Sequence, residues 1–253
     1  MFGWYGCVLS LRVALRRQRQ MCIRYRFFTP ITHIMFGDEG TLDKYVGDMV
    51  MAFWGAPLDD VGHAEHAVRS GLEMLKKVEE LKPEFERLGL PEINIGVGVN
   101  TGVMNVGDMG SEYRRAYTVL GDAVNLGSRL ESVTKFYGVK FLVGEKTQAL
   151  ASSFQYRLID RIRVKGKKEP VTVYEPIGEI DGVDGRMVES IARFHMALFH
   201  YYYQQWDKAL LVLAQLHQEA PDKIYELYRE RIMMLKNEPL DADWDGVFDH
   251  EVK

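Results

Sequence analysis

Two short apolar segments around Gly47-Asp48 constrain the fold of this 253-residue chain more than any other feature. Thr41–Val46 precedes the pair, and Met49–Trp54 follows it as an almost unbroken apolar run. A Gly-Asp pair between two such segments is typical of a tight β-hairpin turn, and the apolar second strand indicates burial. The sequence therefore predicts an antiparallel pair of strands here.

A further strand, predicted over residues 93–100, has one apolar face and one face almost free of side chains. Apolar and small or polar residues alternate there: Ile93, Ile95, Val97 and Val99 on one face, and Asn94, Gly96, Gly98 and Asn100 on the other. Glycine in a strand indicates close approach by a ligand or by another backbone. We expect one of these two neighbours on that face.

The remaining pattern alternates helices and strands. Apolar residues at helical spacing predict a helix over 64–81, with Asp59 or Asp60 as its cap, and a second helix runs from Gly121-Asp122 to about Tyr137. Residues 107–115 are expected to form a polar loop. Further strands are predicted over 116–120, 139–143, 156–164 and 170–176. This order indicates an α+β sandwich, with helices on one face of an antiparallel sheet.

A helical extension follows the predicted sandwich. Residues 181–190 are expected to be a linker, and aromatic-rich helices are predicted over 190–218 and 222–236. Trp206-Asp207-Lys208-Ala209 and the following leucines resemble half of a tetratricopeptide hairpin. One such unit cannot bury its own apolar face, so we expect it to pack on the sandwich or on a partner.

Charge and cysteine are divided unevenly along the chain. Residues 1–26 hold six arginines, both cysteines and no acidic residue, so this segment carries a charge of +6. Because the net charge of the chain is −4, the remaining residues carry −10. From residue 27 onward the chain is acidic and free of cysteine, which excludes a disulfide scaffold and a cysteine-ligated zinc site and suits the cytoplasm. The acidic balance also argues against nucleic-acid binding. No apolar run reaches the roughly 18 residues of a membrane span.

The arginine-rich segment 1–26 does not match a targeting signal. A signal peptide places its positive charge before its apolar run, whereas here the apolar residues precede the arginines. A transit peptide fits no better. Residues 17–24 resemble the translation of a transposon-end adapter, so we expect 1–26 to be non-native. The predicted domains are thus this segment, a core over 27–180 and the helical extension over 181–253.

Four local features have side chains suited to chemistry, each with an ordinary alternative. Asp48 at the turn can hold a hard cation, and Lys44 points off the adjoining strand. An exposed turn with a solvated lysine is the alternative. Asn125 and Arg129 share a helix face, as any polar pair four residues apart does. The Lys165-Gly166-Lys167 turn is either a phosphate grip or a solvated loop.

In order, these features resemble the catalytic domain of class III adenylate and guanylate cyclases. The resemblance covers about 150 of the 253 residues, from Phe27 to Pro176. The matching segments are GTLDKYVGDMVMAFWGAP at 40–57, NTG at 100–102, GSEYRRAYTVLGDAVN at 110–125, SRLE at 128–131 and VKGK at 164–167. This family has a ferredoxin-like antiparallel sheet. The tail, with WDGV at 244–247, is similar to the extension of bacterial cyclases that carry an extracellular sensor and membrane helices upstream.

The resemblance implies conversion of ATP to cyclic AMP and pyrophosphate. In the family, the ribose 3′-oxygen attacks the α-phosphorus, assisted by two Mg²⁺ or Mn²⁺ ions. Asp48 matches the second of the family's two metal-binding aspartates. The family's sites lie between two subunits, which implies a homodimer and a parent protein with this domain on the cytoplasmic side.

The resemblance also assigns roles to individual residues. Lys44 and Thr118 match the pair that reads the base, and guanylyl cyclases usually have Glu and Cys there, so ATP is favoured. Asn125 matches the residue that orients the ribose, and Arg129 matches the residue that stabilises charge on the α-phosphate. Lys165, with Lys167 as the alternative, matches the lysine that binds the terminal phosphate.

The first metal aspartate of the family has no counterpart. It lies on the first strand, about 45 residues before the second, and here that region falls in the acid-free segment 1–26. We therefore expect the first strand and its carboxylate to be missing and this chain to make little or no cyclic AMP. The alternative is a non-catalytic, degenerate cyclase that dimerises or senses nucleotide. A single-stranded RNA binder is disfavoured because the central strands lack a pair of stacking aromatic residues.

Overall fold

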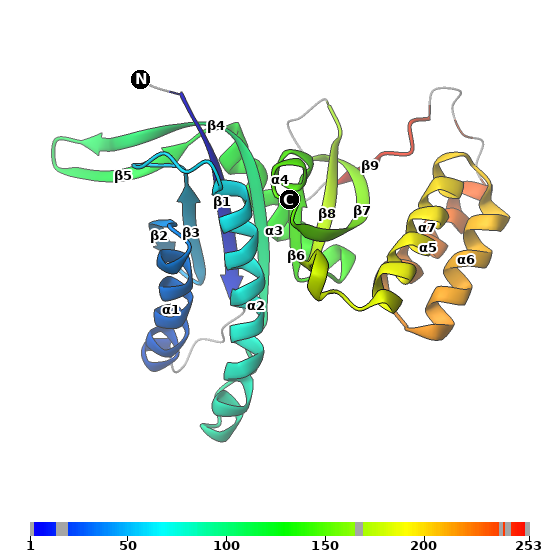
Figure 1. Ribbon diagram of the computed structural model, residues 1–253, viewed down its shortest axis with the longest axis horizontal. Helices are drawn as coiled ribbons and strands as arrows, with labels where there is room; N and C mark the ends of the chain where they lie inside the picture. Colours follow the sequence, from blue (N-terminus) through cyan, green and yellow to red (C-terminus); the bar gives the residue numbers. More distant parts are fainter. Residues whose placement is uncertain (1–2, 14–19, 165–168, 238–239, 241–243, 251–253) are drawn as a thin grey trace. The chain divides into compact units, whose positions relative to one another are not determined.

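The computed structural model describes residues 3–13, 20–164, 169–237, 240 and 244–250 (Figure 1). The chain divides into two compact units, the first made of residues 1–135 and 139–153 and the second of residues 136–138 and 154–253. Unit 1 contains strands β1 Gly3–Val13, β2 Thr41–Val46, β3 Met49–Trp54, β4 Ile95–Ser111, β5 Arg114–Leu120 and β6 Phe141–Gly144. Its helices are α1 Gln20–Gly37, α2 His63–Arg87, α4 Glu145–Leu150 and most of α3 Asp122–Tyr137.

The strands of unit 1 lie in the order β2-β3-β1-β4-β6, with β5 paired to β4. The β2–β3 hairpin forms as predicted, and Gly47 occupies the left-handed region at its turn with φ +66°. The neighbouring pairs are antiparallel except β4 and β6, which are parallel. The mixed α+β class and the largely antiparallel sheet are therefore confirmed.

Strand β1 corrects the expectation that a central strand is missing. Residues 3–13 pair with β3 on one side and with β4 on the other, with Val8 opposite Phe53 and Asn100. Cys7 to Leu11 are buried, and an apolar run of this kind is stabilised between two strands and two covered faces. The segment therefore completes the sheet, although its sequence carries no carboxylate.

The glycine face of β4 seats helix α3. A methyl group on Gly98 would collide with the backbone of Gly127 and Glu131, and one on Gly96 would lie 2.7 Å from the Thr134 hydroxyl. The absent side chains therefore let another backbone approach, which is one of the two neighbours predicted from the sequence. The Asn100 side-chain amide adds a hydrogen bond of 2.9 Å to the Ala123 carbonyl.

Helix α2 buries the predicted apolar face. Ala64, Ala67, Val68, Val78 and Leu81 are buried, at the spacing of one helix stripe. Gly62 is the N-cap residue, and no side chain caps the first turn of the helix. Asp60 instead accepts a hydrogen bond of 2.8 Å from the Gly62 amide. The prediction that Asp59 or Asp60 caps the helix is therefore wrong, because Asp60 stabilises a turn just before the helix.

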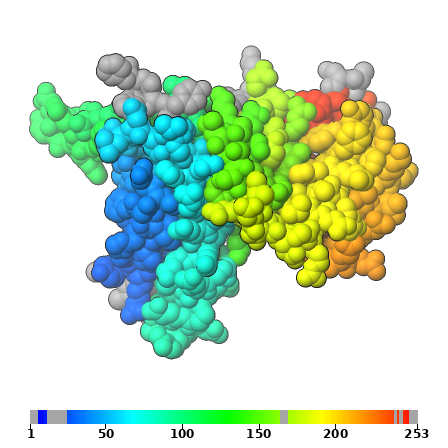
Figure 2. Space-filling model, in the orientation of Figure 1, coloured from blue at the N-terminus to red at the C-terminus, as the bar shows by residue number. Residues whose placement is uncertain are grey.

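The expected loop over 107–115 is wrong. The ladder between β4 and β5 continues from Asn105 opposite Leu120 to Ser111 opposite Arg114, and only two residues form the turn. The hairpin, drawn in green, stands out from the rest of unit 1 in Figures 1 and 2. Most residues of β5 are exposed. Their polarity is typical of a loop, but backbone pairing makes this segment a two-stranded hairpin.

Unit 2 combines strands with the helical extension. Its strands are β7 Phe154–Val164, β8 Val171–Glu179 and β9 Phe248–His250, and its helices are α5 Gly185–Tyr202, α6 Trp206–Glu219 and α7 Lys223–Asn237, preceded by a 3₁₀ turn at Ile180–Gly182. The expected linker is wrong in part because α5 already begins at Gly185. The long helix predicted over 190–218 breaks between Tyr202 and Trp206.

The helical extension packs on strand β7 within unit 2. Packing on the strands is one of the two arrangements predicted for it, the other being packing on a partner. Arg231 of α7 pairs with Asp160 of β7, and the Tyr228 hydroxyl donates to the Ile159 carbonyl at 2.8 Å. The Tyr137 hydroxyl also donates to Asp160, at 2.6 Å. Within the described ranges, no helix has the length and apolar character needed to cross a membrane.

Candidate functional site

The turn between β2 and β3 presents Asp48 beside the end of β1. Met49, the next residue, pairs with Arg12 of β1. Asp48 is half-buried, so its carboxylate retains contact with solvent. Because residues 1–26 contain no Asp or Glu, β1 brings no second carboxylate to this turn.

Lys44 and Thr118 both contact Asp43. The Thr118 hydroxyl donates to Asp43 Oδ2 at 3.0 Å, and Lys44 Nζ lies 3.6 Å from Asp43 Oδ1. The Asp43 side chain is 1% exposed, whereas the Lys44 side chain is 44% exposed. The structure thus brings together the two residues that the resemblance assigns to the base, with a buried carboxylate between them.

A β-bulge turns Asp43 toward Thr118. The register between β2 and β3 shifts between Leu42 and Lys44, which leaves Asp43 without a partner on β3. A bulge of this kind redirects a side chain that regular alternation would send to the other face. The Asp43 carboxylate consequently links β2 to β5, two strands that each pair with a different neighbour.

Burial governs the charge of Asp43. It raises the pKa of the carboxyl group above its ordinary value, while the Thr118 hydrogen bond and the nearby Lys44 charge lower it. Among the described residues, Oδ1 has no hydrogen-bond partner. The carboxylate therefore depends on one hydroxyl and one ammonium group.

Helix α3 carries Asn125 and Arg129 one turn apart. Asn125 is exposed and Arg129 is partly buried. The helix begins two residues after β5 ends, and its seat on Gly98 of β4 fixes its position in unit 1. Lys165 and Lys167 lie outside the described residues.

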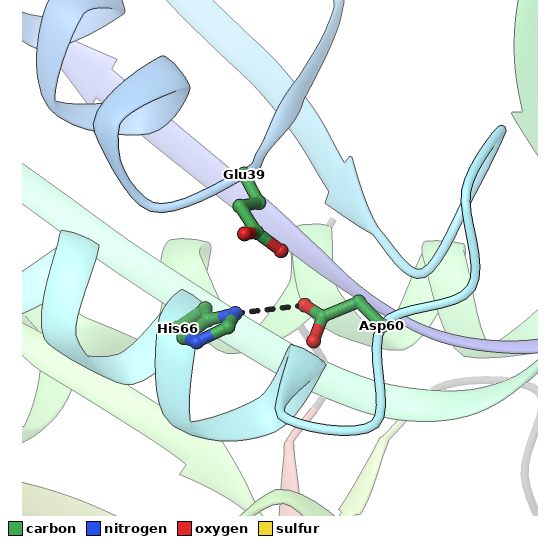
Figure 3. Close-up of side chains that lie close together, drawn as sticks. All are labelled: Glu39, Asp60 and His66. Carbon is green, nitrogen blue, oxygen red and sulfur yellow. Dashed lines mark hydrogen bonds and ion pairs between the residues drawn. The ribbon is translucent and has the colours of Figure 1, made fainter.

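A second cluster gathers at the start of α2 (Figure 3). His66 Nδ1 lies 2.9 Å from Asp60 Oδ2, and Glu39 points toward the same pair. One ligand atom from each residue lies within 4.8 Å of the others. Glu39 lies 27 residues before His66 in the chain, so local spacing in the sequence gives no sign of this cluster. Both Asp60 oxygens already accept hydrogen bonds, which suits a structural anchor for the helix.

Asp43 is the site residue that sequence reasoning missed. Strict alternation along a strand sends Asp43 and Lys44 to opposite faces, so the acid next to the lysine gave no sign of contact with Thr118. Thr118 lies 75 residues away. The adjacent Asp43-Lys44 pair is the only feature of the sequence that marks this site. The contact with Thr118 becomes apparent only with the bulge between Leu42 and Lys44.

Comparison with known proteins places these residues in context. The adenylate and guanylate cyclase catalytic domain family matches residues 30–175. Adenylate cyclase 1 of Rhizobium meliloti (strain 1021) is 33% identical over 159 residues, which cover 62% of this chain and 24% of that protein. The chain spans about a quarter of the length of the curated relatives it matches.

Solved cyclase structures resemble the chain over most of its length. The adenylyl cyclase CyaB from P. aeruginosa has a TM-score of 0.65 and 27% identity, covering 72% of this chain and 98% of that one. The guanylyl cyclase Cya2 has a TM-score of 0.61 and 26% identity, covering 73% and 98%. Neighbours named as adenylyl cyclase and as guanylyl cyclase share the fold, so the fold alone does not distinguish the two.

Proposed function

The chain belongs to the adenylate and guanylate cyclase catalytic domain family, and we propose that it is an adenylate cyclase domain that acts on ATP to form cyclic AMP and pyrophosphate. The juxtaposition of Lys44 and Thr118 on Asp43 is the observation that carries this proposal. An ammonium group donates to the ring nitrogen of adenine, and a threonine oxygen accepts from its amino group.

Residues of α3 are proposed to act on the sugar and the reacting phosphate. The Asn125 amide both donates and accepts, which suits a ribose hydroxyl. Among the described residues Arg129 has no carboxylate partner, so its charge is available to a phosphate oxygen. One of Lys165 and Lys167 is proposed to bind the terminal phosphate. Charge aimed at the α-phosphate accelerates the reaction because negative charge builds up there in the transition state.

The residues present do not fit two divalent cations. Asp48 offers one carboxylate, and the adjoining strand β1 offers none. We propose that Asp48 holds one Mg²⁺ or Mn²⁺ ion with the help of the triphosphate. A second cation without a carboxylate partner is poorly neutralised. The chain is therefore expected to bind ATP and to form little or no cyclic AMP.

Assembly and location follow from the family as proposals. Two copies of the chain are expected to form a homodimer with the sites at their interface, since a symmetric pair can join Asp48 of one copy to the base-reading residues of the other. The full-length protein is proposed to keep this domain in the cytoplasm, below a membrane sensor region. No contact with nucleic acid is proposed.

The second candidate is a non-catalytic nucleotide-sensing module. The acid-free strand β1 beside Asp48 favours it. This candidate shares ATP binding with the first and differs only in turnover. The retained Lys44, Asn125 and Arg129 favour a domain that keeps its substrate contacts.

Exchange of the base-reading pair tests the proposed substrate. Calorimetric titration of the full chain with ATP and with GTP should show tighter binding of ATP, and Lys44→Glu combined with Thr118→Cys should move the preference toward GTP. Lys146→Glu reverses one charge at an exposed position of α4 and should leave the preference unchanged. Unchanged ATP preference in the double variant would show that the base binds elsewhere.

A further inference from the structure

We propose that Asp43 is a positioning residue that makes the Thr118 hydroxyl a hydrogen-bond acceptor toward the base and so sets the choice of adenine over guanine. The inference rests on the proposed function, because it takes Lys44 and Thr118 as the pair that contacts the base. Asp43 is a third residue beside this pair. It accepts a hydrogen bond from Thr118, and the proposed function gives it no role of its own.

The Thr118 hydroxyl has a single proton to donate. A hydroxyl has one hydrogen to donate and two lone pairs, whereas an ionised carboxylate only accepts. Because Thr118 donates to Asp43 Oδ2 at 3.0 Å, its proton is committed to the carboxylate. The lone pairs of Thr118 are then what the hydroxyl can offer to a ligand.

Adenine and guanine differ in the hydrogen-bonding groups on their edges. Adenine carries an amino donor where guanine carries the O6 acceptor. With its proton bonded to Asp43, the Thr118 oxygen can accept a hydrogen bond from the adenine amino group. Toward guanine the same oxygen meets O6, which is also an acceptor, and no hydrogen bond forms. A threonine without this constraint rotates its hydrogen toward O6 and tolerates either base, so the fixed direction of the hydrogen bond creates the discrimination.

Burial and the local backbone hold the Asp43 carboxylate beside Thr118. The bulge places its carboxylate between β2 and β5, and the side chain is 1% exposed. Thr118 is also buried, with 6% of its surface accessible. Water therefore competes little for either group, and Lys44 at 3.6 Å favours the ionised, acceptor-only form of the carboxylate. The Lys44 side chain itself remains 44% exposed.

A double-mutant cycle on the full chain tests this role. Dissociation constants for ATP and GTP are measured by calorimetry for the wild type, Asp43→Ala, Thr118→Val and the double variant. Loss of one such hydrogen bond should lower the ATP-over-GTP ratio about tenfold in each single variant. Since Asp43 acts through Thr118, the double variant should show no further loss. Thr118→Ser keeps the hydroxyl and should keep the ratio.

Two further variants guard against a general effect on the fold. Asp43→Leu keeps about the size of the side chain but cannot accept a hydrogen bond, which frees the Thr118 hydroxyl hydrogen, so the ratio should fall as in Asp43→Ala. Asp38→Ala is the matched control, because Asp38 also accepts from a hydroxyl, Ser70 at 2.7 Å, and lies 3.8 Å from an arginine. This control should leave the ratio unchanged.

The outcomes separate the inference from the proposed function. Wild-type preference for ATP that survives in both Asp43 variants overturns the inference and leaves the proposed function intact. Additive losses in the double variant also overturn it, because they show that Asp43 acts independently of Thr118. A wild-type chain that binds both nucleotides equally overturns the two together.

Discussion

Arg231 of α7 forms a buried ion pair with Asp160 of β7, with Nη1 and Oδ2 2.8 Å apart. Both side chains are almost fully enclosed, at 6% and 0% exposure, and the Tyr137 hydroxyl donates to the same carboxylate oxygen. Burial lowers the pKa of Arg231, but the nearby Asp160 charge outweighs it and the net pKa is raised, so the guanidinium group stays protonated. This group fastens the helical extension to the strands of unit 2.

Loss of this ion pair should destabilise unit 2. Arg231→Met removes the cation and leaves a buried carboxylate, which costs about 3 kcal/mol of unfolding free energy in urea. Lys236→Met, which breaks an exposed pair with Asp207, should cost below about 1 kcal/mol. Equal effects of the two substitutions would show that the extension is not held by this contact.

Gly98→Ala should disturb the seat of α3. The added methyl group meets the backbone of Gly127 and Glu131, which cannot move as a flexible side chain does, so a loss of about 2 kcal/mol is expected. Because α3 carries Asn125 and Arg129, ATP affinity should fall as well. Gly37→Ala has open space around the new methyl group and is the control. Wild-type stability and ATP affinity in Gly98→Ala would contradict the observed packing.

Cys7 reports whether β1 is docked in solution. Burial raises the pKa of its thiol to about 12, and the Thr101 hydroxyl lies 3.4 Å from the sulfur. In a Cys22→Ser background at pH 8, the folded chain should react with iodoacetamide at least about a hundredfold more slowly than the urea-unfolded chain. Equal rates in the two states would mean that residues 3–13 do not occupy the centre of the sheet.

His195 should make the stability of unit 2 depend on pH. The Leu158 amide donates to His195 Nε2 at 2.8 Å, and burial, with a smaller effect of Arg157, lowers the pKa of the ring. The unfolded ring titrates near about 6.5, so below that pH the unfolded chain binds more protons than the folded one. The unfolding free energy should therefore decline as the pH falls through this window. His195→Gln retains an acceptor for the amide and should flatten the decline, and an unchanged slope would assign it to another group.

Local patterns in the sequence predicted much of unit 1. The apolar runs around Gly47 fixed the β2–β3 hairpin, and the spacing of apolar residues located the buried face of α2. The glycines of β4 indicated a close neighbour, which proved to be α3. These features depend on residues that are adjacent or at regular spacing, and such patterns are visible in one dimension.

Contacts that depend on distant residues escaped the sequence. The composition of residues 1–26 argues against a native strand, yet the apolar run of β1 pairs with β3 and β4. The contact of Asp43 with Thr118 required a bulge and a residue 75 positions away, on a strand that does not pair with β2. Tertiary packing decides both, and neither alternation nor propensity records it.

The rate of cyclic AMP formation tests the central claim, that the domain recognises ATP but lacks a carboxylate needed for turnover. The purified full chain is incubated with ATP and Mn²⁺ beside its Asp48→Asn variant, and ATP binding is verified in the same preparation. We expect bound ATP and a rate of product formation no higher than that of the variant. Cyclic AMP formation far above the variant's rate would contradict the account.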